Sequence, residues 1–315
     1  MSGYAIEVEG LAKTYAGGVE AVRGISFEVA LGEVFGLLGP NGAGKSTTVG
    51  MLTTTIVPTG GTARLHGFDV AAQPIAARAV SSVVFQEAVV DRALTGRRHL
   101  AVHASLWRVD EREAEDRIAD LGVSLHLAEL FDRPVGTYSG GERRRLEIAR
   151  ALVSHPRVLF LDEPTVGLDP RIRAELLDVI AGLRDAAETT IFLTTHYLDE
   201  AERLCDRLAI MHEGRIVALD RPAALLADLG AQIVELRTHD NAPAVLELLR
   251  ELGIAGGDAF SVGATVTIPL HDRTATSTIG DIEAAGVSVS AIGAREPTLD
   301  DVYLHLTGGQ LALAA

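Results

Sequence analysis

Apolar and polar positions alternate along the first part of the chain in the manner of β-strands. Residues 5–11 (AIEVEGL) and 25–30 (ISFEVA) mix apolar and polar positions with a period near two, which predicts strands with one half-polar face. Residues 34–39 (VFGLLG) are continuously apolar, as is typical of a parallel strand buried on both faces. The sequence therefore predicts an antiparallel layer followed by the first strand of a buried parallel sheet.

Two later apolar runs have the length of buried strands, at residues 158–162 (VLFLD) and 190–195 (TIFLTT), and helix-like segments lie between them. Buried strands that alternate with helices indicate an α/β fold with a parallel sheet. Residues 97–130 interrupt this rhythm with polar, helix-favouring runs whose apolar residues recur three and four positions apart. We expect them to form an inserted helical subdomain at about residues 90–155.

The character of the chain changes after about residue 230. Three short runs (QIVELRT, TVTIPL and VSVSAI) are typical of strands, and two longer runs between them (APAVLELLRELG and TSTIGDIEAAG) are typical of helices. Residues 231–315 carry 11 acidic and 4 basic residues. The pattern predicts one domain over residues 1–228 and a small, acidic accessory domain of β-α-β-α-β order over residues 229–315.

Charge and composition narrow the classes of function. A net charge of −15 and a pI near 5.1 argue against a nucleic-acid partner, which needs a concentrated basic face. A single cysteine excludes an internal disulfide and fits a reducing compartment. No stretch approaches the roughly 18 consecutive apolar residues of a membrane helix, and residues 1–10 lack the pattern of a signal peptide. We therefore expect a soluble chain whose contact with a membrane runs through a partner.

The strongest motif is GPNGAGKST, residues 39–47, which matches G-x-x-x-x-G-K-[ST] between a buried strand and a helix. Only two of the 28 basic residues are lysines, so Lys45 stands out where a compact ammonium is needed. The pattern predicts a P-loop that binds ATP and Mg²⁺, with Lys45 on the phosphates and Ser46 on the metal. Its expected nucleotide-binding residues are Gly39, Pro40, Asn41, Gly42, Ala43, Gly44, Lys45, Ser46 and Thr47.

Two carboxylates end the buried run VLFLDEP. Asp162 is expected to hold Mg²⁺, and Glu163 to polarise the attacking water. The carboxyl ends of parallel strands meet at one edge of a sheet, which places this pair beside the P-loop.

A second anion site is indicated at residues 138–152 (YSGGERRRLEIARAL). A glycine pair opens a helix there, Ser139 suits its N-cap, and the free N–H groups of a helix start attract anions. The chain already has a phosphate site in its P-loop, and these residues alone leave open what the second site holds. The arginines 143–145 are expected to form a solvated helix face.

Together these motifs resemble the nucleotide-binding subunits of ATP-binding cassette (ABC) transporters through residue 220. The resemblance implies a P-loop NTPase core with an antiparallel β subdomain and an inserted helical subdomain. It further implies that Tyr15 stacks on adenine, that Gln86 contacts Mg²⁺ and the attacking water, and that His196 contacts the γ-phosphate. Lys45, Gln86, Glu163 and His196 then form the catalytic set, and Asp169 of the D-loop, GLDP, is expected to contact nucleotide.

The family also answers what the second anion site holds. YSGGE resembles the family signature LSGGQ, which caps the nucleotide of the other subunit in a head-to-tail dimer. The resemblance assigns Ser139, Gly140, Gly141 and Glu142 to the ATP of a second copy. Tyr138 and Glu142 depart from the usual leucine and glutamine. A carboxylate near a helix start favours the dipole but opposes a phosphate, so the role of Glu142 stays open.

Only one P-loop and one signature occur, which disfavours the twin-cassette translation factors. EPTLDDVYLHLTG (296–308) and LTGRRHL (94–100) resemble drug-efflux ATPases of the daunorubicin-resistance type. That branch implies a homodimeric ATPase on the cytoplasmic face of the cell membrane. It would power a separate ABC-2 permease that exports drugs or other hydrophobic compounds. A regulatory clamp with little turnover, and an ATPase for lipid or polysaccharide export or for import, are the alternatives.

Overall fold

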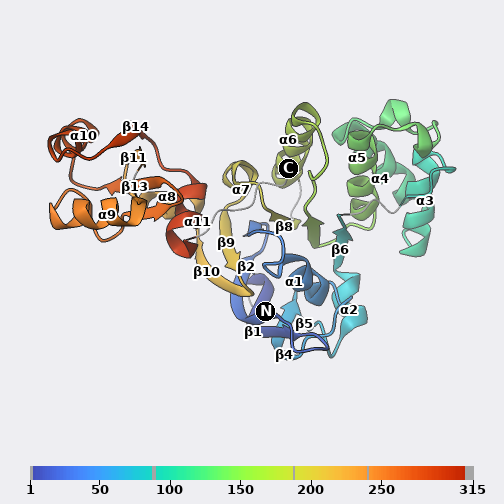
Figure 1. Ribbon diagram of the computed structural model, residues 1–315. Helices are drawn as coiled ribbons and strands as arrows, with labels where there is room; N and C mark the ends of the chain where they lie inside the picture. Colours follow the sequence, from blue (N-terminus) through green and yellow to red (C-terminus); the bar gives the residue numbers. More distant parts are fainter. Residues whose placement is uncertain (1–2, 87–89, 187–188, 240, 309–315) are drawn as a thin grey trace. The chain divides into compact units, whose positions relative to one another are not determined.

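The computed structural model describes residues 3–86, 90–186, 189–239 and 241–308, and it divides into two compact units (Figure 1). The first unit is Met1–Ile216 and the second is Val217–Ala315. The sequence pattern placed the boundary near residue 228, whereas this division falls within a strand, Arg215–Asp220. Each unit has its own sheets and helices and is described by itself.

The first unit contains the predicted antiparallel layer, a four-stranded sheet in the order β2-β1-β4-β5. Strand β1 pairs antiparallel with β2 and with β4, and β4 pairs with β5. The strands are β1 (Tyr4–Thr14), β2 (Glu20–Ala30), β4 (Gly60–Leu65) and β5 (Phe68–Asp69).

The predicted parallel sheet is six-stranded, in the order β10-β9-β3-β8-β7-β6. Strands β3, β7 and β8 are buried at every residue, which explains why apolar residues predominate in them. Its strands are β3 (Val34–Leu38), β6 (Ser81–Val84), β7 (Val158–Asp162), β8 (Thr190–Thr195), β9 (Arg207–His212) and β10 (Arg215–Asp220). Neighbours β6–β7, β7–β8, β8–β3 and β3–β9 run parallel, so their carboxyl ends share one edge.

Stacked aromatic rings join the two sheets. Phe27 of β2 stacks on Phe35 of β3 with ring centroids 5.3 Å apart, and Phe35 stacks on Phe192 of β8 at 5.6 Å. Offset stacking of this kind adds about 0.5–1.5 kcal/mol beyond area burial. The contact ties the antiparallel layer to the strand that leads into the P-loop.

The described residues between β6 and β7 contain helices, turns and one isolated β-bridge, between Thr95 and Pro134, and they form the inserted helical subdomain (Figure 1). Side chains cap its main helices, namely Thr95, Asp110 and Ser139. The subdomain comprises α3 (Gly96–Leu106), α4 (Glu111–Ser124), two short 3₁₀ helices (Ala128–Leu130 and Val135–Thr137) and α5 (Gly140–Leu152). The remaining helices of this unit are α1 (Lys45–Leu52), α2 (Pro74–Ala79), α6 (Pro170–Ala186) and α7 (Leu198–Leu204).

The second unit is an antiparallel sheet in the order β12-β13-β11-β14, with a β-α-β-β-α-β succession. The predicted β-α-β-α-β order lacked β12, a three-residue strand with a serine at its centre. Val234, Leu236, Val266 and Ile268 of the sheet pack with Leu249 in one core. The elements are α8 (Pro222–Ala227), β11 (Gln232–Thr238), α9 (Ala242–Glu251), β12 (Phe260–Val262), β13 (Thr265–Leu270), α10 (Ala275–Ala284), β14 (Val289–Arg295) and α11 (Leu299–Thr307).

A buried carboxylate holds the start of α11 against the sheet. Asp301 is 1% exposed, and both of its oxygens accept hydrogen bonds from Arg295, at 2.6 and 2.8 Å. Arg295 also donates to Glu235 of β11 at 2.8 Å, and Asp301 closes a capping box with Thr298. This network accounts for the sequence EPTLDDVYLHLTG, whose second aspartate is the buried one.

Burial raises the pKa of Asp301, but hydrogen bonds from Arg295 and Thr298 outweigh it and hold the pKa below its ordinary value. Such a carboxylate stabilises the fold above its unfolded pKa and loses that contribution as the pH falls through the folded pKa. The network therefore weakens only in acid, below about pH 4.

Within the described ranges, no helix is long and apolar enough to span a membrane.

Replacing Asp301→Asn is expected to loosen the second unit at pH 7, because the substitution removes charge-assisted hydrogen bonds worth about 2 kcal/mol. Amide hydrogen exchange of β11 and β14 should then be roughly 30-fold faster, measured by mass spectrometry on the full chain. The control is Asp272→Asn, an exposed carboxylate of the same unit, which should exchange like the wild type. Unchanged exchange in Asp301→Asn would contradict the role given to this network.

Candidate nucleotide site

The P-loop lies where the motif predicts it, between β3 and α1. Gly44, the residue before α1, has a φ of 106°, and a Cβ built on it would lie 2.4 Å from the carbonyl oxygen of Ala21. Only glycine fits both this backbone and this contact. The first turn of α1 has N–H groups without helical acceptors, so its start forms an anion site.

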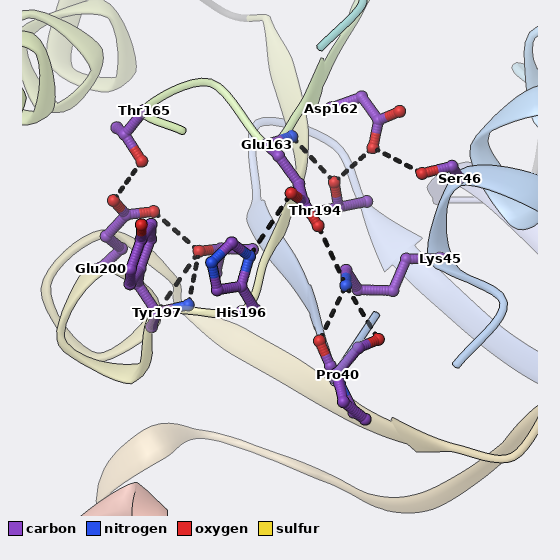
Figure 2. A network of polar contacts seen from close by, with 12 residues as sticks. Pro40, Lys45, Ser46, Asp162, Glu163, Thr165, Thr194, His196, Tyr197 and Glu200 are labelled. Carbon is purple, nitrogen blue, oxygen red and sulfur yellow. Dashed lines mark hydrogen bonds and ion pairs between the residues drawn. The ribbon is translucent and has the colours of Figure 1, made fainter. Parts of the chain in front are cut away.

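Lys45 is 4% exposed, and its ammonium points back into the loop (Figure 2). The Nζ atom donates to the carbonyl oxygens of Gly39 at 2.8 Å and Pro40 at 3.2 Å. It also forms an ion pair with Glu163 Oε1 at 3.0 Å. The lysine of the P-loop and the carboxylate after β7 are therefore in direct contact, as their shared sheet edge predicted.

Glu163 occupies a backbone conformation that is unusual for a residue with a side chain. Its φ is 46°, in the left-handed region, which costs about 1–2 kcal/mol for an L-residue. The backbone N–H is held by Thr194 of β8, through the hydroxyl at 3.0 Å and the carbonyl at 3.2 Å. Glu163 is 6% exposed, and the turn directs its carboxylate between Lys45 and His196 (Figure 2). Strain of this kind persists where the surroundings fix the backbone, often at a reactive group.

Asp162 and Ser46 place oxygen atoms side by side. Asp162 Oδ1 accepts a hydrogen bond from the Thr194 hydroxyl at 2.6 Å and lies 3.4 Å from Ser46 Oγ. A hydroxyl and one carboxylate beside a phosphate site are the protein ligands that Mg²⁺ commonly takes. Two of the three predicted protein ligands of the metal, Ser46 and Asp162, thus lie together.

His196 follows β8 and is 7% exposed. Its Nδ1 lies 3.4 Å from Glu163 Oε2, and its ring packs on Tyr197 with centroids 4.1 Å apart. Neither ring nitrogen makes a hydrogen bond to any described residue. A buried imidazole without a hydrogen-bond partner suits an additional acceptor, such as a phosphate oxygen.

A cavity of about 280 Å³ opens beside Lys45, Ser46 and Glu163, whereas Asp162 and His196 are not among its lining residues. It is lined by Tyr15, by residues of the P-loop from Pro40 to Thr47, by Gln86 and by Glu163. Tyr15 is 40% exposed, and its hydroxyl lies 3.3 Å from Thr47 Oγ1. An aromatic ring at the mouth, a P-loop inside and a buried cation fit a nucleoside polyphosphate. The residues therefore suit ATP. A larger cavity of about 580 Å³, beside Arg145 and Glu175, is lined by none of the residues predicted to bind nucleotide or metal.

The signature residues are built as a helix start but lie outside this cavity. Ser139 caps α5 by accepting a hydrogen bond from the Glu142 N–H at 3.2 Å, and Glu142 Oε2 accepts from the Ser139 N–H at 2.6 Å. Gly141 packs tightly on α6, since an added Cβ would lie 2.2 Å from Ile172 Cγ2. The capping box gives Glu142 a local role that explains a carboxylate at this position.

Asp169 of the D-loop is also exposed and outside the cavity. Its Oδ1 accepts a hydrogen bond from the Ile172 N–H at 3.0 Å, within the first turn of α6. Its predicted contact with nucleotide remains a prediction, as does that of Ser139, Gly140, Gly141 and Glu142.

The expectation of a solvated arginine face is wrong for Arg144, which is 6% exposed. Burial lowers the pKa of this guanidinium, and Glu147 at 3.1 Å counteracts the effect. The spacing could have signalled it, since Arg144 shares a helix face with the buried Gly141, Ile148 and Ala151. Three consecutive arginines suggest that all three side chains are exposed to solvent, so composition alone does not reveal that one of them is buried.

A second network fixes the turn after β8. Glu200 of α7 is 1% exposed and accepts hydrogen bonds from the hydroxyls of Thr165 and Thr195, the latter at 2.7 Å (Figure 2). It also pairs with Arg173 Nε at 2.7 Å. Sequence reasoning missed Glu200 because an acidic residue on an amphipathic helix ordinarily faces water.

The family model described as ABC transporter matches residues 22–166, which include the P-loop, the signature and Glu163. A similar relative is the daunorubicin/doxorubicin resistance ATP-binding protein of Streptomyces peucetius, 42% identical over 96% of this chain and 92% of that protein. Another is a Nod factor export ATP-binding protein of Rhizobium johnstonii, 38% identical over 99% of this chain and 97% of that protein.

Solved structures agree with the first unit. The ABC transporter component cbiO1 of Clostridium perfringens superposes with a TM-score of 0.67 at 29% identity, covering 72% of this chain and 92% of that one. A dimeric post-hydrolysis structure of the cassette MJ0796, bound to ADP and Pi, has a TM-score of 0.62 and covers 69% of this chain and 98% of that one. At 21% identity this second likeness establishes the fold alone. The chain belongs to the ABC transporter ATP-binding proteins of the daunorubicin/doxorubicin-resistance type, and it is an ABC transporter ATPase.

Proposed function

We propose that this chain powers an ABC-2-type exporter as a head-to-tail homodimer that serves a separate membrane permease. The observation that carries the proposal is the capped start of α5, which lies outside the P-loop cavity of its own chain and would be free to bind an anion elsewhere. In a head-to-tail dimer each such helix start closes the nucleotide site of the other copy. MJ0796, which shares the fold, formed a dimer with ADP and Pi bound.

Catalysis in such a site consists of positioning and charge neutralisation. Lys45 would exchange its contact with Glu163 for the β- and γ-phosphate oxygens. Glu163, released from the ammonium, would accept a proton from the attacking water. His196, whose nitrogens have no hydrogen-bond partner among the described residues, would donate to the γ-phosphate.

Ser46, Asp162 and Gln86 would hold Mg²⁺ beside the phosphates. The ion would supply positive charge to the phosphoryl group as it is transferred. Ser46 and Asp162 already lie 3.4 Å apart, and Gln86 lines the same cavity. These oxygens match the hard-ligand preference of the metal.

The exported compound is proposed to be a drug or another hydrophobic molecule, and its selection is assigned to the permease. The Streptomyces relative is named for daunorubicin and doxorubicin resistance, and the Rhizobium relative for Nod factor export. The ATPase would work at the cytoplasmic face of the cell membrane. A clamp with little turnover is less well supported, because Lys45, Glu163 and His196 converge at one point.

Glu163→Gln is expected to slow ATP hydrolysis by roughly 10²- to 10⁴-fold, the usual contribution of a general base. ATP should still bind at least as tightly as to the wild type, because the substitution removes the carboxylate that pairs with Lys45 and competes with the phosphates for its ammonium. Phosphate release and binding of a fluorescent ATP analogue measure the two effects. The control is Glu202→Gln, an exposed residue of α7. Rapid multiple turnover by Glu163→Gln would exclude Glu163 as the base.

Glu142→Gln is expected to keep both stability and ATPase activity, because glutamine also completes a capping box. Glu142→Ala should lose about 0.5–1 kcal/mol of unfolding free energy, since the Ser139 N–H loses its acceptor. Urea unfolding and phosphate release measure these outcomes. A change in the ATPase rate of more than about tenfold in Glu142→Gln would instead show that the carboxylate acts on the nucleotide.

A further inference from the structure

The guanidinium of Arg144, in the first unit, forms hydrogen bonds with the segments that carry Glu163 and Gln86. Arg144 is in the second turn of α5, and its side chain is 7% exposed. Among the described residues it donates to five oxygen atoms, which matches the five N–H groups of a guanidinium. The acceptors are the carbonyls of Pro164 (2.8 Å), Phe85 (2.5 Å), Asp162 (3.2 Å) and Glu163 (3.4 Å) and the carboxylate of Glu147 (3.1 Å).

The four carbonyls belong to the two segments that carry the proposed catalytic groups. Three of them form the backbone of residues 162–164, on both sides of and including Glu163. The fourth, Phe85, directly precedes Gln86 at the end of β6. Among the described residues, Arg144 forms a hydrogen bond with one residue that lines the nucleotide cavity, Glu163, and it does so at the backbone carbonyl.

The backbone that Arg144 holds is the strained one. Glu163 has its left-handed φ of 46°, and Thr194 binds its N–H on one side. Arg144 binds the carbonyls on the other side. A planar fork can hold several converging carbonyls at once, and a compact ammonium with three donors cannot reproduce that arrangement.

We propose that Arg144 is a positioning residue for ATP hydrolysis, which fixes the turn that aims Glu163 and the strand end that presents Gln86. This inference rests on the proposed role of Glu163 as the base. Glu147 balances the buried charge, and the hydrogen bonds to the carbonyls do the positioning. Arg144 acts through the backbone and not on the nucleotide, so its loss lowers kcat and leaves ATP binding intact.

The test compares Arg144→Gln with the wild type in the full chain. Phosphate release at varied ATP gives kcat and KM, and equilibrium binding of a fluorescent ATP analogue gives the affinity. We expect kcat to fall roughly 100-fold, the effect of misplacing a catalytic group by about 1 Å, while affinity stays within threefold. The control is Arg171→Gln on α6, whose side chain is 87% exposed and which should match the wild type.

Arg144→Lys keeps a cation beside Glu147 and so keeps the fold even if Arg144→Gln does not. Its kcat should still fall at least about tenfold with affinity unchanged, because the ammonium cannot reach all four carbonyls. A folded Arg144→Lys with the wild-type kcat overturns the proposal. So does a variant in which affinity and kcat fall together, since that pattern marks damage to the whole site.

Glu163→Gln, assayed beside these variants, distinguishes the role of Glu163 as the base from the role of Arg144 in positioning it. If Glu163→Gln stalls and the Arg144 variants turn over normally, the positioning role is wrong and the base assignment stands. If Glu163→Gln turns over normally, the base assignment itself is wrong.

Discussion

The ion pair between Lys45 and Glu163 is the interaction on which the rest of the site depends. It joins two loops, after β3 and after β7, that are more than a hundred residues apart in sequence and meet only because their strands lie in one parallel sheet. Both residues are almost fully buried, and breaking such a pair by removing one partner typically costs about 3–5 kcal/mol. A polyphosphate would compete with Glu163 for the Lys45 ammonium, so that binding of nucleotide would release the Glu163 carboxylate.

The buried charges around this pair form a frame for a strained turn. Arg144 holds its carbonyls from α5, Thr194 holds the Glu163 N–H from β8, and Glu200 holds Thr165 from α7. The helix that provides Arg144 also begins with the capped signature, Ser139–Gly141. In the proposed dimer, the first residues of α5 would therefore contact the nucleotide of the other copy. Arg144, in the next turn of the same helix, contacts the backbone at Glu163 of its own chain.

Local patterns predicted much of this structure. The runs VLFLD and TIFLTT coincide with β7 and β8, and the P-loop and Ser139 as N-cap followed from motif and spacing. Tyr15 and Gln86, which line the cavity, were predicted only through the family resemblance. Tertiary contacts decided the rest. Arg144 and Glu200 look like surface residues until their partners, up to 59 residues away in sequence, are in place. The short β12 depended on strand pairing that composition does not reveal, whereas the S-x-x-E spacing of Ser139 and Glu142 was a sequence signal for the capping box.

In the proposed dimer, the signature at the start of α5 completes the nucleotide site of a second copy. The most direct test of this arrangement is the solution mass of Glu163→Gln by light scattering, with ATP and Mg²⁺ and without nucleotide. We expect a monomer without nucleotide and a dimer with it, and a Ser139→Arg change in the same background should abolish the dimer while ATP still binds. A chain that binds ATP and stays monomeric in both conditions would contradict this arrangement.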